Sequence, residues 1–249
     1  AAQGFRIGGV NVVPPSACAA DLAALGLTDA DVSAYKSDTL WSYEAGLHSS
    51  WLDRRMIFNV AAFLIDWKDM QQRVGLGACG FFANLNAGAA RNKGGEFDLR
   101  WAATDGLMIS LGAGYTDSEI TDAGKFVATI VKGDPVQNAP RWTASAALDY
   151  DFRLASLPVY VHADFAYVDK SYNANNTAPL LRLRPAYNLA NVRGGAHLGR
   201  WDISLFVENL TDEKANLADV SPMAIEFPGR QRISVNRPRT FGAEAKVSF

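Results

Sequence analysis

The chain has only two cysteines, Cys18 and Cys79, and three histidines among its 249 residues. No metal-ligand spacing such as CxxC occurs, so the sequence gives no support for a metal site. It also lacks a G-x-S-x-G turn and any glycine-rich loop leading from a strand into a helix. The sequence therefore predicts no catalytic site, no metal and no cofactor.

The chain also lacks a large excess of either charge and any long apolar run. A net charge of −2 provides no basic surface for nucleic acid. No run of about eighteen apolar residues is present, so no membrane-spanning helix is expected. A membrane-spanning β-strand hides its hydrophobicity in alternation, so a mean hydropathy of −0.04 remains compatible with a β-barrel in a membrane.

Strict alternation of apolar and polar residues runs to the end of the chain. One parity is apolar and ends on an aromatic residue: Phe241, Ala243, Ala245, Val247 and Phe249. The other parity is mostly polar and includes Glu244 and Lys246. This period of two predicts a strand with one apolar face, typical of the closing strand of an outer-membrane barrel.

The same pattern recurs along the chain, with a weaker signal where both parities are apolar or the parity is uncertain. The expected strands are 40–51, 57–65, 93–103, 107–116, 141–150, 159–167, 187–198 and 202–208, with a further candidate at 5–13. Short connections at 52–55, 104–106, 153–157 and 199–201 alternate with long ones near 14–39, 75–92, 117–140, 169–186 and 211–238. Gly106 is expected to supply a positive φ in one short turn. Short turns at one rim and long loops at the other are typical of transmembrane barrels.

Aromatic residues of the apolar parity lie near the expected strand ends and suggest two membrane-interface girdles. They are Trp41, Trp51, Trp101, Tyr115, Trp142, Tyr150, Tyr167 and Phe249. Charged residues of the other parity need water or a polar plug, because a dry core would leave them without partners. We therefore predict an all-β fold, an antiparallel up-and-down transmembrane β-barrel segment of about ten strands.

Several stretches, in this order, resemble the C-terminal part of TonB-dependent outer-membrane receptors. They are Ser37-Asp-Thr-Leu-Trp-Ser-Tyr-Glu-Ala-Gly-Leu47, Phe58-Asn-Val-Ala-Ala-Phe-Leu-Ile-Asp-Trp-Lys-Asp-Met-Gln71, Asn84-Leu-Asn-Ala-Gly-Ala-Ala-Arg-Asn-Lys-Gly-Gly-Glu-Phe97, Phe206-Val-Glu-Asn-Leu-Thr-Asp212 and Pro238-Arg-Thr-Phe-Gly242. The resemblance implies that residues 1–249 are part of a larger barrel, without the plug domain and the TonB-contacting segment of such receptors. It also implies energy-coupled uptake of a scarce nutrient across the bacterial outer membrane, with an iron–siderophore complex as the default substrate.

The same resemblance sets the expected partners. These are membrane lipid and lipopolysaccharide, a small-molecule ligand, the barrel-assembly machinery through the C-terminal strand and Phe249, and the plug and TonB through the missing N-terminal part.

Two alternatives stay open. A self-contained passive porin or structural barrel would need residues 5–13 to pair with residues 240–249. A soluble β-sandwich binding module would place the charged parity in solvent outside the sandwich.

The long loops hold the candidate ligand residues. Arginines and aromatics suit anionic or sugar-like ligands, and they occur in the last two long loops as Tyr172, Arg182, Arg184, Phe227, Arg230 and Arg232. Short helices are expected at 16–27 and 28–34, each with a hydroxyl N-cap. Cys18 and Cys79 fall in long loops on the same side of the predicted barrel, either as a disulfide or as two free thiols.

Overall fold

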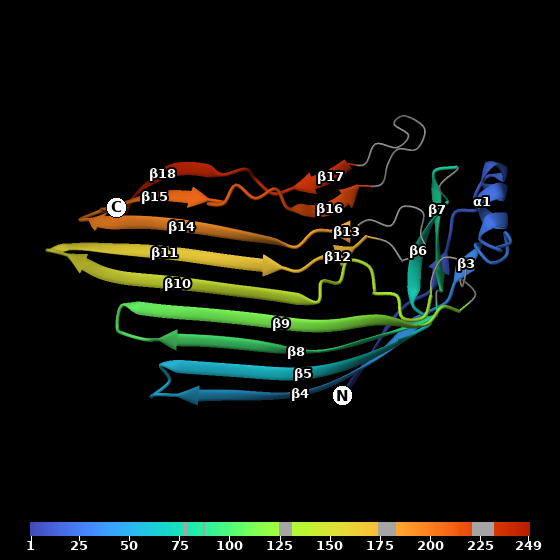
Figure 1. Ribbon diagram of the computed structural model, residues 1–249, viewed down its shortest axis with the longest axis horizontal. Coiled ribbons are helices and arrows are strands. Elements are labelled where there is room, and N and C mark those ends of the chain that lie inside the picture. The colour runs from blue at the N-terminus through green and yellow to red at the C-terminus, as the bar shows by residue number, and fades with distance from the viewer. Residues whose placement is uncertain (77–78, 87, 125–130, 174–182, 221–231) are drawn as a thin grey trace.

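The computed structural model describes residues 1–76, 79–86, 88–124, 131–173, 183–220 and 232–249. Ten strands form one antiparallel sheet in the order β1-β4-β5-β8-β9-β10-β11-β14-β15-β18. Their bounds are β1 (Ala2–Arg6), β4 (Asp38–Trp51), β5 (Met56–Lys68), β8 (Ala89–Ala102), β9 (Leu107–Asp122), β10 (Trp142–Leu154), β11 (Leu157–Val168), β14 (Tyr187–Leu198), β15 (Trp201–Glu208) and β18 (Thr240–Val247). Figure 1 shows this curved sheet with tight turns at one end and long loops at the other.

The predicted all-β, up-and-down fold is therefore confirmed. Each strand pairs with its neighbour in the meander, and five long connections alternate with four short turns. The turn between β4 and β5 places Leu52, Asp53 and Arg54 at positive φ, and the turn between β14 and β15 uses Gly199. All four short turns lie where they were predicted, because alternation and turn residues are local properties of the chain. The turn at 52–55 has its predicted bounds, whereas the turn predicted at 153–157 is shorter, because β10 extends to Leu154 and β11 begins at Leu157.

The apolar face of the sheet is largely exposed. Leu205 and Phe241 retain 67% and 71% of their accessible surface, and Trp142 retains 51%. Within the described part of the chain, no second layer packs on this face, so the soluble-sandwich alternative is wrong. A single-layer sheet with this much bare apolar surface requires an apolar environment outside the chain.

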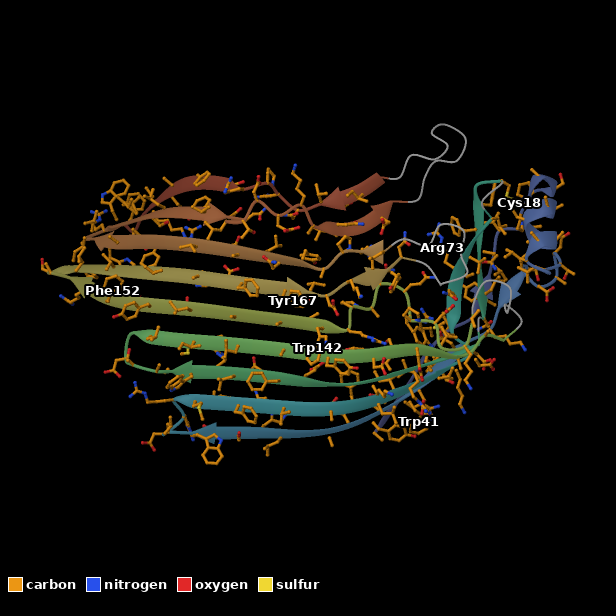
Figure 2. All side chains as sticks on the ribbon, viewed as in Figure 1. Cys18, Trp41, Arg73, Trp142, Phe152 and Tyr167 are labelled. Carbon is orange, nitrogen blue, oxygen red and sulfur yellow. A yellow bond between two sulfur atoms is a disulfide. The ribbon has the colours of Figure 1, made fainter. Side chains whose placement is uncertain are left out.

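Aromatic side chains lie near both ends of the apolar face. Tyr115 and Trp142 pack with ring centroids 4.7 Å apart toward the loop end, and Tyr150 and Phe152 stack at 4.8 Å near the tight turns. Figure 2 shows Trp41, Trp142 and Tyr167 toward the loop end and Phe152 near the opposite end. This distribution agrees with the two predicted girdles.

The two edges of the sheet are β1 and β18. β1 pairs with β4, and β18 pairs with β15, so the described strands leave the sheet open. The pairing required by a self-contained barrel is therefore absent from the described residues. Residues 5–13 also do not form one strand: β1 ends at Arg6, and Gly9–Val10 forms β2, which pairs with β3 (Ala34–Tyr35).

The long loops contain short hairpins of their own. These are β2 with β3, β6 (Gln71–Leu76) with β7 (Phe81–Asn86), β12 (Ser171–Tyr172) with β13 (Leu183–Arg184), and β16 (Asn216–Val220) with β17 (Arg232–Val235). Much of the predicted loop 75–92 is therefore the ordered hairpin β6–β7 and the start of β8.

The predicted helices are only partly correct. Residues 16–27 contain the 3-10 turn η1 (Ser16–Cys18) and the short helix α1 (Ala19–Ala24), whose N-caps are Pro15 and Cys18 rather than a hydroxyl residue. Residues 28–34 form turns that lead into β3 instead of a helix. Within these turns, Asp31 Oδ2 accepts hydrogen bonds from the backbone N–H and hydroxyl of Thr28 at 3.0 and 2.6 Å. No helix among the described residues is long and apolar enough to span a membrane.

Gly106 lies in a short turn, as predicted, but the predicted reason for a glycine there, a positive φ, is wrong. Gly106 is not among the residues with positive φ. A Cβ at this position would lie 2.1 Å from the carbonyl oxygen of Asp151, whose N–H donates to Gly106 O at 2.7 Å. Glycine therefore allows close backbone approach between two adjacent hairpins.

The buried core of the described chain lies at the loop end, outside the middle of the sheet. Residues 7–37 and 69–88, here called the cap, supply most of it. The core residues are Cys18, Leu22, Leu27, Val32, Met70, Leu76, Ala83 and Leu85 from the cap, with Ala90, Ile120 and Ala123 from the rim of the sheet.

Candidate functional site

The polar face of the sheet carries a cross-strand row on β4, β5 and β8. The register aligns His48 with Asn59 and Asn59 with Asp98. His48 Nδ1 lies 3.1 Å from Asn59 Oδ1, and Asn59 Nδ2 donates to Asp98 Oδ1 at 3.4 Å. Side-chain hydrogen bonds thus join three neighbouring strands on this face.

The next strands in this row carry small residues. Asp98 aligns with Gly112, and Gly112 aligns with Ser145. Together with Glu44 and Glu96, these residues line a shallow depression on the polar face. Among the described residues, neither Glu44 nor Glu96 has an ion-pair partner. The polar face is therefore recessed at Gly112, and the carboxylates of Glu44 and Glu96 place negative charge beside this recess.

A second polar cluster lies on β14, β15 and β18. Arg193 Nη1 donates to Ser204 Oγ at 2.9 Å and to Glu244 Oε2 at 2.6 Å. Its guanidinium also lies 4.7 Å from the centroid of the Phe206 ring. Lys246 Nζ lies 3.1 Å from Glu244 Oε1. Arg193 thus connects the terminal strand to the two strands before it.

Two histidines on the polar face lie beside carboxylates. His162 Nδ1 is 2.6 Å from Asp149 Oδ1, and its Nε2 is 3.5 Å from Asp164 Oδ1. His197 Nδ1 is 3.1 Å from Asp202 Oδ2, whose Oδ1 accepts from the Tyr160 hydroxyl at 2.9 Å. These contacts join neighbouring strands. No group of three or more potential metal ligands occurs in the described ranges.

The cap is cross-linked in several ways. Cys18 and Cys79 form a disulfide with a Cα–Cα distance of 5.1 Å, which connects η1 to the β6–β7 hairpin. Asn11 Nδ2 donates to Asn84 O at 2.8 Å, and Asn84 N–H donates back to Asn11 Oδ1 at 2.9 Å. The two long segments of the cap are thus held together by covalent and hydrogen bonds.

Asp38 attaches the cap to the sheet. Its carboxylate accepts hydrogen bonds from the backbone N–H and guanidinium of Arg6, from Trp67 Nε1 at 3.0 Å and from Gln71 N–H at 3.1 Å. The side chain is only 2% exposed. Such a buried carboxylate requires these donors, because an unpaired charge would be costly.

Three of the six predicted ligand residues lie in the described part of the chain. Arg182, Phe227 and Arg230 lie outside the described residues. Tyr172 lies in β12, and Arg232 is the first residue of β17. Arg184 is paired with Asp219, and this largely buried ion pair joins the last two long loops. The predicted assembly residue, Phe249, follows β18 and is fully exposed.

Sequence reasoning missed Arg73 and Phe82. These residues lie on β6 and β7, and the Arg73 guanidinium is 3.2 Å from the centroid of the Phe82 ring. The signal in the sequence was the alternation of residues 71–76 and 81–86, which places both on one face of a hairpin.

The chain matches known β-barrel receptors in sequence and in fold. Residues 1–210 match the family described as TonB dependent receptor-like, beta-barrel. Among solved structures, the ferric yersiniabactin uptake receptor FyuA from Yersinia pestis is similar over 100% of this chain and 34% of its own, with 21% identity and a TM-score of 0.75.

Two further structures agree in fold. The siderophore receptor PiuA from Acinetobacter baumannii is similar over 88% of this chain and 30% of its own, with 19% identity and a TM-score of 0.63. The copper transporter OprC is similar over 86% of this chain and 32% of its own, with 14% identity and a TM-score of 0.64. The chain thus spans about a third of the length of these proteins. With a family match over residues 1–210, a ten-stranded meander, and one apolar and one polar face, this chain belongs to the TonB-dependent receptor β-barrel family.

Proposed function

We propose that residues 1–249 form the C-terminal barrel part of a bacterial outer-membrane receptor for energy-coupled uptake of a scarce nutrient, most specifically an iron–siderophore complex. The observation that carries the proposal is the family match over residues 1–210 together with an open ten-stranded sheet whose apolar face is exposed. One of the similar structures is named a siderophore receptor and another a ferric yersiniabactin uptake receptor, and these names support the substrate class.

In this proposal, the polar face of the sheet is the barrel lumen, and a plug domain from the remainder of the protein fills it. Gly112 and Gly114 add no side chain to this face, and the hydroxyls of Ser145 and Thr143 lie where a Cβ would meet them at 2.7 and 2.9 Å. The carboxylates of Glu44 and Glu96 lie beside this recess and would form ion pairs with basic residues of the plug. TonB would act through the plug, and no reaction would be catalysed.

The membrane contacts follow from the same placement. Lipid would cover the apolar face, and lipopolysaccharide would surround the loop end. The exposed strand β18 and Phe249 would engage the barrel-assembly machinery during insertion. The remaining long-loop candidates, Tyr172, Arg182, Phe227, Arg230 and Arg232, stay proposed ligand contacts, and Arg184 would contribute by holding the two loops together.

Uptake of radiolabelled iron by cells with and without the full-length gene tests this function. Iron would be supplied as different siderophore complexes, with and without a protonophore that collapses the proton gradient. We expect saturable uptake of one complex that disappears in the deletion strain and after collapse of the gradient. Gene-dependent uptake that persists without the gradient would instead support a passive barrel.

A further inference from the structure

The β6–β7 hairpin presents two chemically different faces. Leu76, Ala83 and Leu85 of one face are buried in the core of the cap, together with Leu22 of α1. The opposite face carries Arg73, Gly75 and Phe82, and all three are exposed. Since successive side chains of a strand point to opposite sides, packing on α1 directs this second face away from the helix.

The exposed face holds a cation against an aromatic ring. The centre of the Arg73 guanidinium lies 3.2 Å from the Phe82 centroid, within the range of cation–π contact. No carboxylate among the described residues forms an ion pair with Arg73. The guanidinium keeps a planar fork of N–H donors, which suits paired oxygen atoms of an anion.

The hairpin is anchored at its tip and at its base. The disulfide of Cys79 ties its tip to η1, and Cys79 N–H donates to Asp21 Oδ2 at 3.1 Å. At its base, Asn86 Nδ2 donates to Asp69 O at 2.7 Å and Lys36 O at 3.0 Å. A contact surface fixed in this way loses little conformational entropy when it binds a ligand.

The face lies at the loop end of the barrel. In Figure 2, Arg73 is on the side of the hairpin toward β12 and β13, whereas Cys18 is on the helix side. We propose that Arg73 and Phe82 form a ligand contact that recognises an anionic, ring-containing metal chelate. Arg73 would bind its oxygen atoms, and Phe82 would hold the guanidinium in place and contact the ring. This inference rests on the proposed uptake function and names the ligand class.

Equilibrium binding to the purified full-length receptor tests the proposal. The probes are the ferric complex of 2,3-dihydroxybenzoate, which is anionic and aromatic, ferric citrate, which is anionic without a ring, and ferrioxamine B, which is cationic and has no ring. The variants are Arg73→Gln, Arg73→Lys and Phe82→Leu. Arg153→Gln is the matched control, because Arg153 is an exposed arginine at the tight-turn end of β10.

We expect the ferric 2,3-dihydroxybenzoate complex to bind the wild-type receptor more tightly than the other two probes. Arg73→Gln should weaken this binding by about 10- to 100-fold, the range for loss of charge-assisted hydrogen bonds. Arg73→Lys should restore only part of it, because lysine lacks the planar fork. Arg153→Gln should bind as the wild type does.

Two results would overturn the proposal. One is wild-type affinity of Arg73→Gln for the aromatic probe, and the other is preference of the wild-type receptor for ferrioxamine B or ferric citrate. In either case, gradient-dependent iron uptake by cells would still support the proposed function. Circular dichroism and the heat-dependent gel mobility of each variant separate loss of binding from failure to fold.

Discussion

The guanidinium of Arg6 is paired with the buried carboxylate of Asp38, and this pair connects edge strand β1 to β4. The same carboxylate accepts from Trp67 on β5 and from the backbone of Gln71, where the cap begins. A single side chain thus fixes the end of β1, the rim of the sheet and the base of the β6–β7 hairpin.

Replacing Asp38 by alanine should therefore loosen the cap. The change leaves Trp67 Nε1 and Gln71 N–H without their acceptor, and we expect a loss of about 3 kcal/mol in local stability. Hydrogen exchange of amides in residues 69–76 of the full receptor measures it. Asp66→Ala is the control: the partly exposed pair of Asp66 with Arg91 should contribute about 0–1 kcal/mol. Equal protection in both variants would contradict the central role of Asp38.

Removing the disulfide should destabilise the cap and leave the sheet intact. Cys18 and Cys79 are 61 residues apart, and closing a loop of this length restricts the unfolded chain by about 2–4 kcal/mol. In the variant with Cys18→Ser and Cys79→Ser, we expect protease cleavage within the cap under conditions in which the wild type resists. The barrel should keep its heat-dependent gel mobility. Cleavage at the same rate in both proteins would show that hydrogen bonds alone hold the cap.

Gly106→Ala tests the close approach of two hairpins. The added methyl group would meet the carbonyl oxygen of Asp151 at 2.1 Å, and this backbone atom has little freedom to move. We expect a loss of about 1–3 kcal/mol in thermal unfolding of the full receptor.

The control for this variant is Gly75→Ala. Gly75 has open space around its Cβ position and no positive φ, so the alanine variant should unfold at the wild-type temperature. If Gly106→Ala also unfolds at that temperature, the turn has more room than the structure indicates.

Arginine placed on opposite faces of β10 tests which face contacts lipid. Leu148 lies on the apolar face and is 37% exposed, and Leu148→Arg should cost about 2–4 kcal/mol near the middle of a membrane. Ala147 is the adjacent residue on the polar face and aligns with Asp164, so Ala147→Arg should be tolerated. Denaturant unfolding from lipid vesicles gives both values. A larger cost for Ala147→Arg would reverse the assignment of the faces.

Local patterns were sufficient to predict most of the sheet. The strand signals near Leu107–Asp122 and Trp142–Leu154 and the short turn between β14 and β15 depend on residues close together in the chain. The errors arose where tertiary contacts decide. Residues 5–13 divide after Arg6, because Gly9 and Val10 pair with β3, a segment distant in the chain. The backbone approaches that segment closely at Gly8, where a Cβ would lie 2.4 Å from Tyr35 O.

The candidate site was less predictable than the fold. Arg184 was expected to contact a ligand, but its guanidinium forms an ion pair with Asp219, 35 residues away in the chain. Phe82 was missed because residues 75–92 were interpreted as a loop, and Arg73 was missed because it precedes that range and was assigned to no strand. Only the ordered hairpin β6–β7 brings the two side chains together. In both cases, the chemistry of the side chain was visible in the sequence and its partner was not.

The sequence by itself determined the antiparallel strands, the two faces of the sheet and the short turns, because a period of two and turn chemistry act over a few residues. The tertiary structure alone decided how the loops assemble into the cap. Asn11 and Asn84 are 73 residues apart, and Asp38 collects donors from three segments. Such contacts depend on which loops meet at the rim of the folded sheet, and no local pattern in the chain specifies that meeting.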